Sequence, residues 1–105
     1  MIELYQAEWC PHSHRVRQRL TELGLDFVAH QVPVDPAERT ELESATGRRS
    51  IPTLVLDDGS VVSGDDEILV ALDGRFDEPP EAVHHREKAV EEWPGWMRLA
   101  GPLPE

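Results

Sequence analysis

The apolar stretch at residues 51–56 restricts the fold more than any other feature, because a second apolar segment follows it after only four residues. Residues 51–56 have the composition of a central strand, with its one proline confined to the strand start. Residues 57–60 (Asp-Asp-Gly-Ser) are a turn signal, and residues 61–62 begin a second strand. Because so short a link joins antiparallel neighbours, this part of the chain predicts a β-hairpin.

A strand and a helix are predicted at the start of the chain. Residues 2–5 alternate apolar and polar side chains, as a short strand does. From Pro11 onward, apolar residues recur at helical spacing until Gly24 supplies a stop signal; they are Val16, Leu20 and Leu23. Pro11 suits a first helical turn, where its missing N–H costs nothing. We expect a helix of about three turns there.

A second strand and helix are predicted before the hairpin, and two further helices after it. Residues 27–32 have strand character, and Asp35 is expected to cap a helix that runs to about Ala45, with Glu38 completing a capping box. After the hairpin we expect a helix over residues 64–74 and an acidic helix over residues 81–92.

The remaining tail, from Trp93 on, holds three prolines and two glycines and is expected to be irregular. Its residues Trp93, Trp96 and Met97 could form an apolar patch for a partner, but such a cluster more often folds back to seal a small core.

This order of elements predicts an α/β fold with a four-stranded mixed sheet flanked by helices. Two strands joined by a crossover helix are parallel, whereas the later hairpin is antiparallel. The loop after the first strand carries Cys10, and this topology places it at the carboxyl edge of the sheet, where open α/β sheets bind ligands.

Length and charge exclude several classes of function. A chain of 105 residues is about one domain long. Its net charge of −11 repels phosphate backbones, so nucleic acids and anionic membranes are not expected as partners. No apolar run approaches the ~18 residues of a membrane helix. The first residues lack the pattern of a secretory signal, and we expect a monomeric cytoplasmic protein.

Cys10 is the only cysteine, so the chain cannot form an intrachain disulfide or an all-cysteine zinc site. It precedes Pro11 at the predicted helix start, where free N–H groups and the helix dipole stabilise an anion. His12, His14 and Arg15 can add positive charge in the same turn. The alternative is a buried, inert thiol, but the polar residues around Cys10 favour a reactive one.

Four segments together resemble the glutaredoxins and the related amino-terminal domain of glutathione transferases. They are residues 5–15 with Cys10-Pro11-His12-Ser13, Gly47-Arg48, Ser50-Ile51-Pro52, and Val62-Ser63-Gly64-Asp65-Asp66. The resemblance covers residues 1–75 and implies a thioredoxin-like domain. Residues 76–105 are then an appended helix and tail packed on the same domain.

The resemblance implies a thiol–disulfide oxidoreductase that reduces mixed disulfides with glutathione or another γ-glutamyl thiol. Cys10 is then the nucleophile, supported by Pro11, His12, Ser13 and Arg15. A cis bond between Ile51 and Pro52 would expose the Ile51 backbone to the thiol. Gly64 and Asp65 would offer N–H groups to its α-carboxylate, Asp65 or Asp66 would hold its ammonium group, and Arg48 or Arg49 its far carboxylate.

Two departures from the family pattern keep alternatives open. Ser13 replaces the second cysteine of dithiol members, which implies a monothiol mechanism with a small thiol as resolving partner. Ala7 stands where many glutaredoxins carry a lysine, which leaves open a transferase-like thiol-binding domain. An iron–sulfur cluster held between two chains is the other alternative, although Pro11 disfavours it; otherwise we expect no metal. Thiolated or disulfide-bonded proteins are the expected larger partners.

Overall fold

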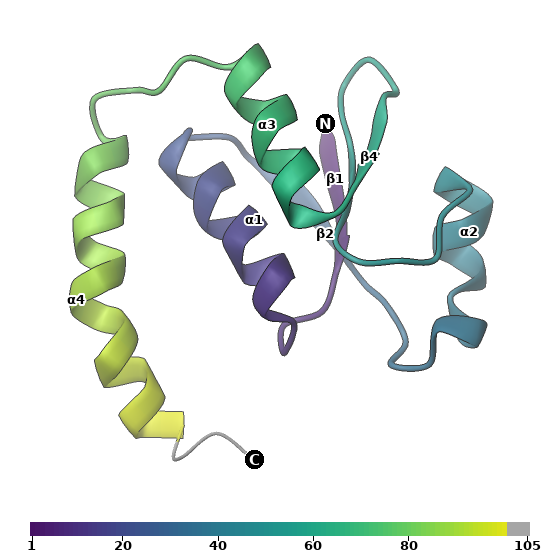
Figure 1. Cartoon of the computed structure of the whole chain (residues 1–105), viewed down its shortest axis with the longest axis horizontal. Coiled ribbons are helices and arrows are strands. Elements are labelled where there is room, and N and C mark those ends of the chain that lie inside the picture. The colour runs from purple at the N-terminus through teal and green to yellow at the C-terminus, as the bar shows by residue number, and fades with distance from the viewer. Residues whose placement is uncertain (101–105) are drawn as a thin grey trace.

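The computed structural model describes residues 1–100 of the chain and the side chains of residues 1–93. The strands are β1 (Ile2–Gln6), β2 (Phe27–Gln31), β3 (Thr53–Val55) and β4 (Val61–Ser63). The α-helices are α1 (Pro11–Glu22), α2 (Thr40–Thr46), α3 (Asp65–Arg75) and α4 (Ala82–Ala100), and a 3₁₀ turn spans Pro36–Glu38. Figure 1 shows α1 and α3 on one side of the sheet and α2 on the other.

The four strands form one mixed sheet in the order β2-β1-β3-β4. β1 pairs in parallel with β2, whereas β3 is antiparallel to both β1 and β4. In the central pair Leu4 lies opposite Leu54 and Tyr5 lies opposite Thr53. The expected mixed sheet is therefore confirmed, and the hairpin lies where the sequence predicts it.

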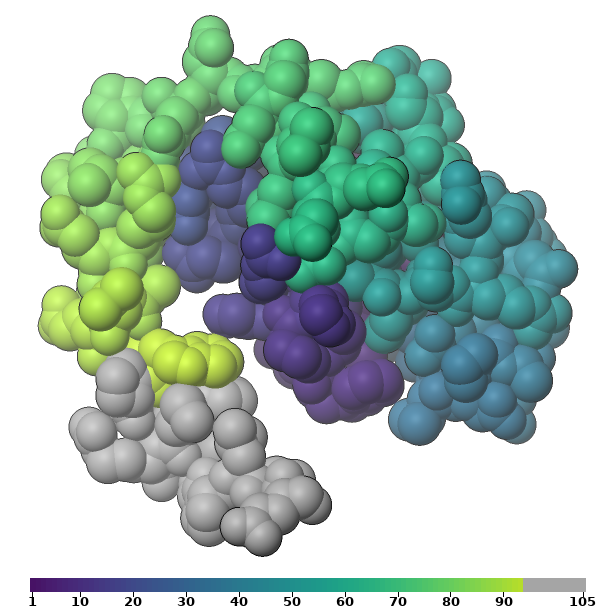
Figure 2. Space-filling model, in the orientation of Figure 1, coloured from purple at the N-terminus to yellow at the C-terminus, as the bar shows by residue number. Residues whose placement is uncertain are grey.

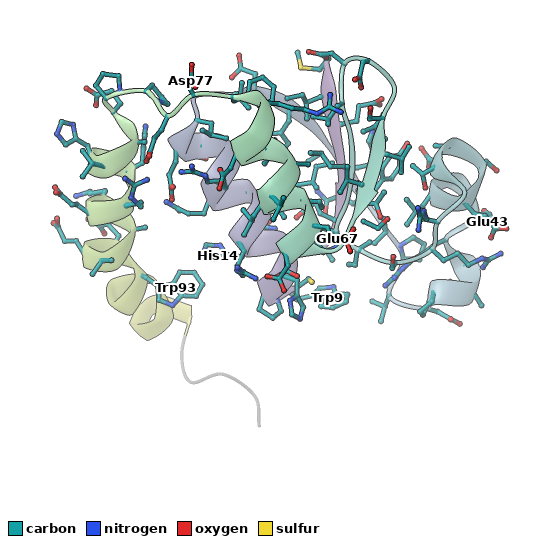
Figure 3. The ribbon with its side chains drawn as sticks, turned by 45° about the horizontal axis from the view of Figure 1, so that its top comes forward. Trp9, His14, Glu43, Glu67, Asp77 and Trp93 are labelled. Carbon is teal, nitrogen blue, oxygen red and sulfur yellow. The ribbon has the colours of Figure 1, made fainter. Side chains whose placement is uncertain are left out.

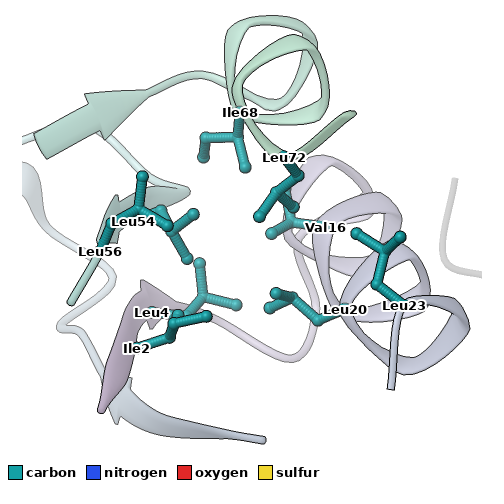
Figure 4. Close-up of a cluster of buried hydrophobic side chains, with 9 residues drawn as sticks. All are labelled: Ile2, Leu4, Val16, Leu20, Leu23, Leu54, Leu56, Ile68 and Leu72. Carbon is teal, nitrogen blue, oxygen red and sulfur yellow. The ribbon is translucent and has the colours of Figure 1, made fainter. Parts of the chain in front are cut away.

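The core lies between the sheet and the two helices α1 and α3 (Figure 4). Alternate strand residues and residues one helical turn apart face it, which is the pattern expected of half-buried strands and amphipathic helices. Its nine buried members are Ile2, Leu4, Val16, Leu20, Leu23, Leu54, Leu56, Ile68 and Leu72. The core therefore holds α1 and α3 against the same face of the sheet.

The helix predicted over residues 35–45 is interrupted, so this prediction was wrong in detail. Asp35 caps only the 3₁₀ turn, accepting a hydrogen bond of 2.9 Å from Ala37 N–H, and α2 begins after Arg39. Arg39 is 6% exposed, and its guanidinium donates to the carbonyl oxygens of Pro33, Val34 and Arg49. These bonds hold the surrounding loop, and the helix breaks at Arg39.

The end of the chain also differs from its prediction. The expected irregular segment from Trp93 is helical as far as Ala100, because α4 continues through Pro94 and Gly95. A proline inside a helix removes one backbone donor, and it can kink the helix without ending it. Residues 101–105 and the side chains of Trp96 and Met97 lie outside the described part.

A cluster of ion pairs attaches α4 to α1. Glu22, the last residue of α1, has a side chain only 8% exposed and binds Arg19 at 2.8 Å and Arg86 of α4 at 3.1 Å. Glu78 also binds Arg86, and Asp73 of α3 binds Arg19 at 2.9 Å. A carboxylate this buried is stable only when cations surround it. Glu22 is therefore the central anion of the contact.

We expect Glu22→Gln to weaken the attachment of α4. The substitution removes the anion between two arginines and lowers the free energy of unfolding by about 1 kcal/mol. Urea denaturation followed by circular dichroism measures this, and hydrogen exchange should accelerate in α4. Glu91→Gln is the control, because Glu91 is 70% exposed and, among the side chains that the structure describes, pairs only with Lys88 of its own helix. Equal effects of both substitutions would contradict a special role for Glu22.

Candidate functional site

Three segments that are far apart in the sequence meet at one edge of the sheet. Because β1 and β3 are antiparallel, the loop that leaves β1 lies beside the residues that enter β3. β4 is antiparallel to β3, so the segment that leaves β4 ends at this same edge. The edge therefore gathers the Cys10 loop with the start of α1, the Ile51–Pro52 segment, and the start of α3.

Cys10 is the N-cap residue of α1, with Pro11 in the first helical position. Its Sγ accepts a hydrogen bond of 3.4 Å from Ser13 N–H, one of the donors that a helix start leaves without a backbone partner. A sulfur in this position lies at the positive end of the helix dipole, where the N–H groups of the first turn can donate to it. Cys10 thus has the placement of a nucleophile.

The polarity of the segment around Cys10 wrongly predicts an open side chain. Cys10 is only 6% exposed, whereas Trp9 is 61% exposed. The reason is the capping geometry, which turns Sγ back onto the first turn of α1. Little of the Cys10 side chain is therefore in contact with solvent.

Ser13 has a different role from the one that its place in the motif suggests. It is fully buried, and its Oγ accepts a hydrogen bond of 3.4 Å from Ala7 N–H. Its backbone N–H is the donor to Cys10 Sγ. The hydroxyl therefore helps to close the loop between β1 and α1, while the backbone contacts the sulfur.

His12 and Arg15 bind the start of α3. His12 Nδ1 lies 3.0 Å from Asp65 Oδ2, and the Arg15 guanidinium reaches Asp65 at 2.5 Å and Asp66 at 2.9 Å. Among the residues that the structure describes, neither side chain contacts the sulfur. Their charges lie in the same turn as Cys10, as predicted, but their direct partners are carboxylates.

Asp65 is the anion that joins the two helices. The hydrogen bond from His12, together with that from Arg15, holds the pKa of its carboxyl below the usual value, against an opposing contribution from desolvation. Its side chain is 14% exposed, whereas that of Asp66 is 86% exposed. Asp66 is therefore the more accessible of the two carboxylates for a ligand.

The Ile51–Pro52 peptide bond is cis, the geometry that the resemblance implies. Pro52 is buried, and its carbonyl oxygen accepts a hydrogen bond of 2.9 Å from Gly64 N–H. Within residues 1–100 the backbone N–H and C=O of Ile51 have no hydrogen-bond partner. These two groups are thus available to an extended ligand, as a strand edge is.

Gly64 does not offer its N–H to a ligand, contrary to the prediction, because Pro52 already accepts that hydrogen bond. Its φ of 90° lies in the region that favours glycine, so the residue is needed for the turn between β4 and α3. No described side chain caps α3, so the N–H groups of its first turn, at Asp65, Asp66 and Glu67, are the candidate donors to an anion.

The two candidate arginines differ in their availability. Arg49 pairs with Glu43 and donates to the carbonyl oxygens of Pro36 and Ala37, so it holds the loop before α2. The Arg48 side chain is exposed and has no ion-pair partner among the described residues. The structure therefore favours Arg48 over Arg49 as a contact for a ligand carboxylate.

Sequence reasoning missed one aromatic contact beside this edge. The rings of His14 in α1 and Trp93 in α4 are stacked, with centroids 4.5 Å apart and planes inclined by 29°. Figure 3 shows Trp9 and Trp93 on two sides of the start of α1. Helical spacing alone cannot reveal this pair, because its partners are 79 residues apart.

Neither a metal centre nor a membrane span is visible in the described part of the chain. It contains no cluster of three or more histidine, cysteine, aspartate or glutamate side chains arranged to hold an ion. Nor does any helix there combine the length and apolarity needed to cross a bilayer.

The fold and the arrangement of this edge define a thioredoxin-like protein. The chain matches the glutaredoxin family model over residues 2–62. It is 34% identical over 76 residues to Glutaredoxin 3 of Escherichia coli K12, covering 70% of this chain and 87% of that protein. The chain therefore belongs to the glutaredoxin family, and a glutaredoxin-like redox role is supported.

Two solved transferases share the fold. A glutathione S-transferase domain-containing protein from Marinobacter aquaeolei VT8 has a TM-score of 0.60 at 32% identity and covers 73% of this chain. A glutathione transferase homologue from Sulfitobacter, solved with bound glutathione, has a TM-score of 0.63 at 20% identity and covers 78% of this chain. The chain spans only 40% and 38% of their respective lengths.

We expect Asp65→Asn to lower the free energy of unfolding by about 1 kcal/mol near neutral pH, because His12 and Arg15 lose their shared carboxylate. A carboxyl whose pKa is lowered by folding stabilises the protein above about pH 4 and loses this contribution as the pH falls through the lowered pKa. The difference between wild type and variant should therefore shrink on acidification.

Denaturation at a series of pH values measures this difference. Asp66→Asn is the matched control, because it removes the same charge from a carboxylate whose one cationic partner within the described side chains is Arg15. A difference for Asp65→Asn that stays constant from neutral pH to about pH 2 would show that its charge does not stabilise the fold.

Proposed function

We propose that this protein reduces mixed disulfides through Cys10 as a single catalytic thiol, with glutathione or another γ-glutamyl thiol as reductant. The observation that carries the proposal is the hydrogen bond from Ser13 N–H to Cys10 Sγ at the start of α1. This donor is directed at the sulfur that would attack, and a thiolate is the form that attacks disulfides. Family membership supports this assignment.

In the first step the Cys10 thiolate attacks the glutathione sulfur of a mixed disulfide. A Cys10–glutathione disulfide bond forms, the substrate disulfide breaks, and the substrate thiol leaves as a thiolate that takes up a proton from water. The leaving sulfur departs opposite to the attacking one, so the substrate thiol lies on the side of the glutathione sulfur that faces away from Cys10.

A second small thiol must complete the reaction. Because Cys10 is the only cysteine, the chain has no resolving thiol of its own. A second glutathione thiolate attacks the glutathione sulfur bound to Cys10, which releases oxidised glutathione and restores the Cys10 thiolate. The net reaction is a thiol–disulfide exchange: one mixed disulfide and one glutathione give the free substrate thiol and oxidised glutathione, and the protein returns to its starting state.

The edge of the sheet offers groups for each part of a γ-glutamyl thiol. The free N–H and C=O of Ile51 can pair with the cysteinyl backbone beside Pro52. The first-turn N–H groups of α3 can bind the α-carboxylate, and the exposed Asp66 can hold the ammonium group. Arg48 is the candidate for the carboxylate at the other end. Asp65 is then a positioning residue, because its carboxylate holds His12 and Arg15 beside the start of α3.

The domain division, large substrates, compartment and oligomeric state of the protein are also part of the proposed function. Residues 1–75 are the proposed glutaredoxin-like domain, and the described part of the following segment is proposed to pack on it through α4. Glutathionylated proteins are the proposed large substrates, and the reducing cytoplasm is the proposed compartment, since thiols stay reduced there. We propose a monomer, because the mechanism needs one thiol from one chain.

Cys10→Ser should abolish reduction of glutathionylated substrates, because no other residue of the chain can supply the nucleophile. Ser13→Ala should leave the rate nearly unchanged, since the Ser13 hydroxyl bonds Ala7 and the contact to the sulfur comes from the backbone. Release of glutathione from a glutathionylated peptide measures both. Activity that survives in Cys10→Ser would refute the proposal.

Arg48→Ala should raise the KM for glutathione by about three- to fivefold with little change in kcat, the size expected for one exposed ion pair. Steady-state kinetics over a range of glutathione concentrations measures this. Lys88→Ala is the matched control, because it removes the same charge from α4, where Lys88 pairs with Glu91 and Glu92. Equal shifts in both variants would mean that only the net charge matters.

A further inference from the structure

A cavity of about 410 Å³ lies between the strands β1 and β2 and the segment that leads from β2 into α2. Figure 2 shows this blue and teal segment on the right of the molecule, away from the green helix α3 and the yellow-green helix α4. The volume is within the range of sites that bind small organic molecules. The cavity is therefore large enough for such a ligand, and Cys10 is not part of its lining.

Two stacked rings belong to the lining of this cavity. Tyr5 alternates with the core residue Leu4 along β1, so its ring lies on the face of the sheet opposite the core. It stacks on His30 of β2, with ring centroids 4.4 Å apart and planes inclined by 15°. His30 Nε2 in turn lies 2.8 Å from a carboxylate oxygen of Glu3. These contacts fix the position of the Tyr5 ring.

The Tyr5 hydroxyl bonds no other described residue, although Tyr5 is only 6% exposed. Within the described part, every side-chain nitrogen or oxygen that is sealed from solvent has a hydrogen-bond partner. The Tyr5 oxygen therefore keeps contact with solvent, and the cavity that Tyr5 lines provides it. A hydroxyl in this position can bond a ligand without breaking a contact inside the protein.

Two carboxylates on the α2 side of the cavity also lack a bonded cation. Glu38 and Glu41 belong to the lining, and neither forms an ion pair with any side chain that the structure describes. Arg39 lies between them in the sequence, but its guanidinium donates to three backbone carbonyl oxygens. The cavity thus brings together a hydroxyl and two carboxylates that are all open to a ligand.

The charges that act on the Tyr5 hydroxyl are negative. Burial raises the pKa of Tyr5, and the carboxylates of Glu3 and Glu41 raise it further. A carboxylate raises the pKa of a phenol because it opposes a second negative charge nearby. The same field stabilises a positive charge beside the hydroxyl.

We infer that this cavity binds a small organic amine in its protonated form, with the ammonium group held by the Tyr5 hydroxyl and the Glu41 carboxylate. An ammonium group only donates hydrogen bonds, so it matches a hydroxyl oxygen and carboxylates. The hydrocarbon part of the amine can cover the apolar lining residues Val32 and Leu42. The site is independent of the thiol chemistry at Cys10.

The test is a nuclear magnetic resonance titration of the full chain with pentylamine, which is an ammonium ion at neutral pH, and with 1-pentanol, which differs in its head group. Pentylamine should shift the amide signals of residues 29–32 and 40–42 until they saturate, whereas 1-pentanol should not. Equal binding of the two compounds, or shifts confined to other segments, would overturn the inference.

Tyr5→Phe should weaken the binding of pentylamine about fivefold, because the ring and its stack on His30 remain and only the hydroxyl is lost. Glu41→Gln should weaken it about threefold, as expected for an exposed ion pair. Glu43→Gln is the matched control, because Glu43 lies in the same helix, pairs with Arg49 and does not line the cavity.

Circular dichroism of each variant should match that of the wild type, since neither the ring stack nor a core residue is changed. The control should bind pentylamine as the wild type does. Unchanged affinity in both Tyr5→Phe and Glu41→Gln, or an equal loss in Glu43→Gln, would show that the cavity is not the binding site.

The ammonium group can belong to a free amine or to a lysine side chain of another protein. Titration with the tripeptide Gly-Lys-Gly, blocked at both ends, distinguishes these sources. Weaker binding of the peptide than of pentylamine identifies a free amine, and tighter binding identifies a lysine side chain. Failure of both to bind would overturn the inference, and this result does not depend on whether Cys10 reduces disulfides.

Discussion

The antiparallel pairing of β1 with β3 is the constraint on which the rest of the structure depends. Leu4 opposite Leu54 places both side chains on the face that α1 and α3 cover, and Tyr5 opposite Thr53 fixes the register. A shift by one residue would turn these leucines away from the core. The same register brings the end of β1, which leads to Cys10, next to Pro52 at the start of β3. Core packing and site assembly are therefore consequences of one strand pair.

Ion pairs complete what the sheet begins. Asp65 joins α3 to the first turn of α1 through His12 and Arg15, and Glu22 joins the last turn of α1 to α4 through Arg86. In a chain with a net charge of −11, both contacts surround a carboxylate with the scarce cations. One contact shapes the ligand edge and the other sets where Trp93 lies. Charge balance therefore affects the site through the positions of helices rather than through direct contact with the sulfur.

Local patterns predicted most elements and the class of site, and their failures have physical reasons. The prolines and glycines after Trp93 led to the prediction that the last helix ends there. Local helix propensities do not take account of the packing of α4 against α1. Asp35 caps a short 3₁₀ turn and not α2, so the predicted helix is interrupted. The break falls at Arg39, whose buried guanidinium donates to the carbonyl oxygens of Pro33, Val34 and Arg49 outside α2. The polarity around Cys10 did not reveal its burial, because the cap turns the sulfur inward. Gly64 and Arg49 were assigned to ligand binding, yet their donors already have partners within the protein.

The sequence by itself determined the order of strands and helices, the single thiol at a helix start and the absence of a second cysteine, because these follow from periodicity, turn chemistry and composition within short windows. Only the tertiary structure decided which polar groups are still available and which are already paired. Among the described residues, the backbone N–H and C=O of Ile51 have no hydrogen-bond partner, whereas the Gly64 N–H is already bonded to Pro52. Arg49 is paired within the protein and Arg48 is not, and the Trp93 ring stacks on His14 across 79 residues. The physical reason is that hydrogen bonds and ring contacts between distant segments depend on how helices pack on the sheet, and no local pattern contains that information.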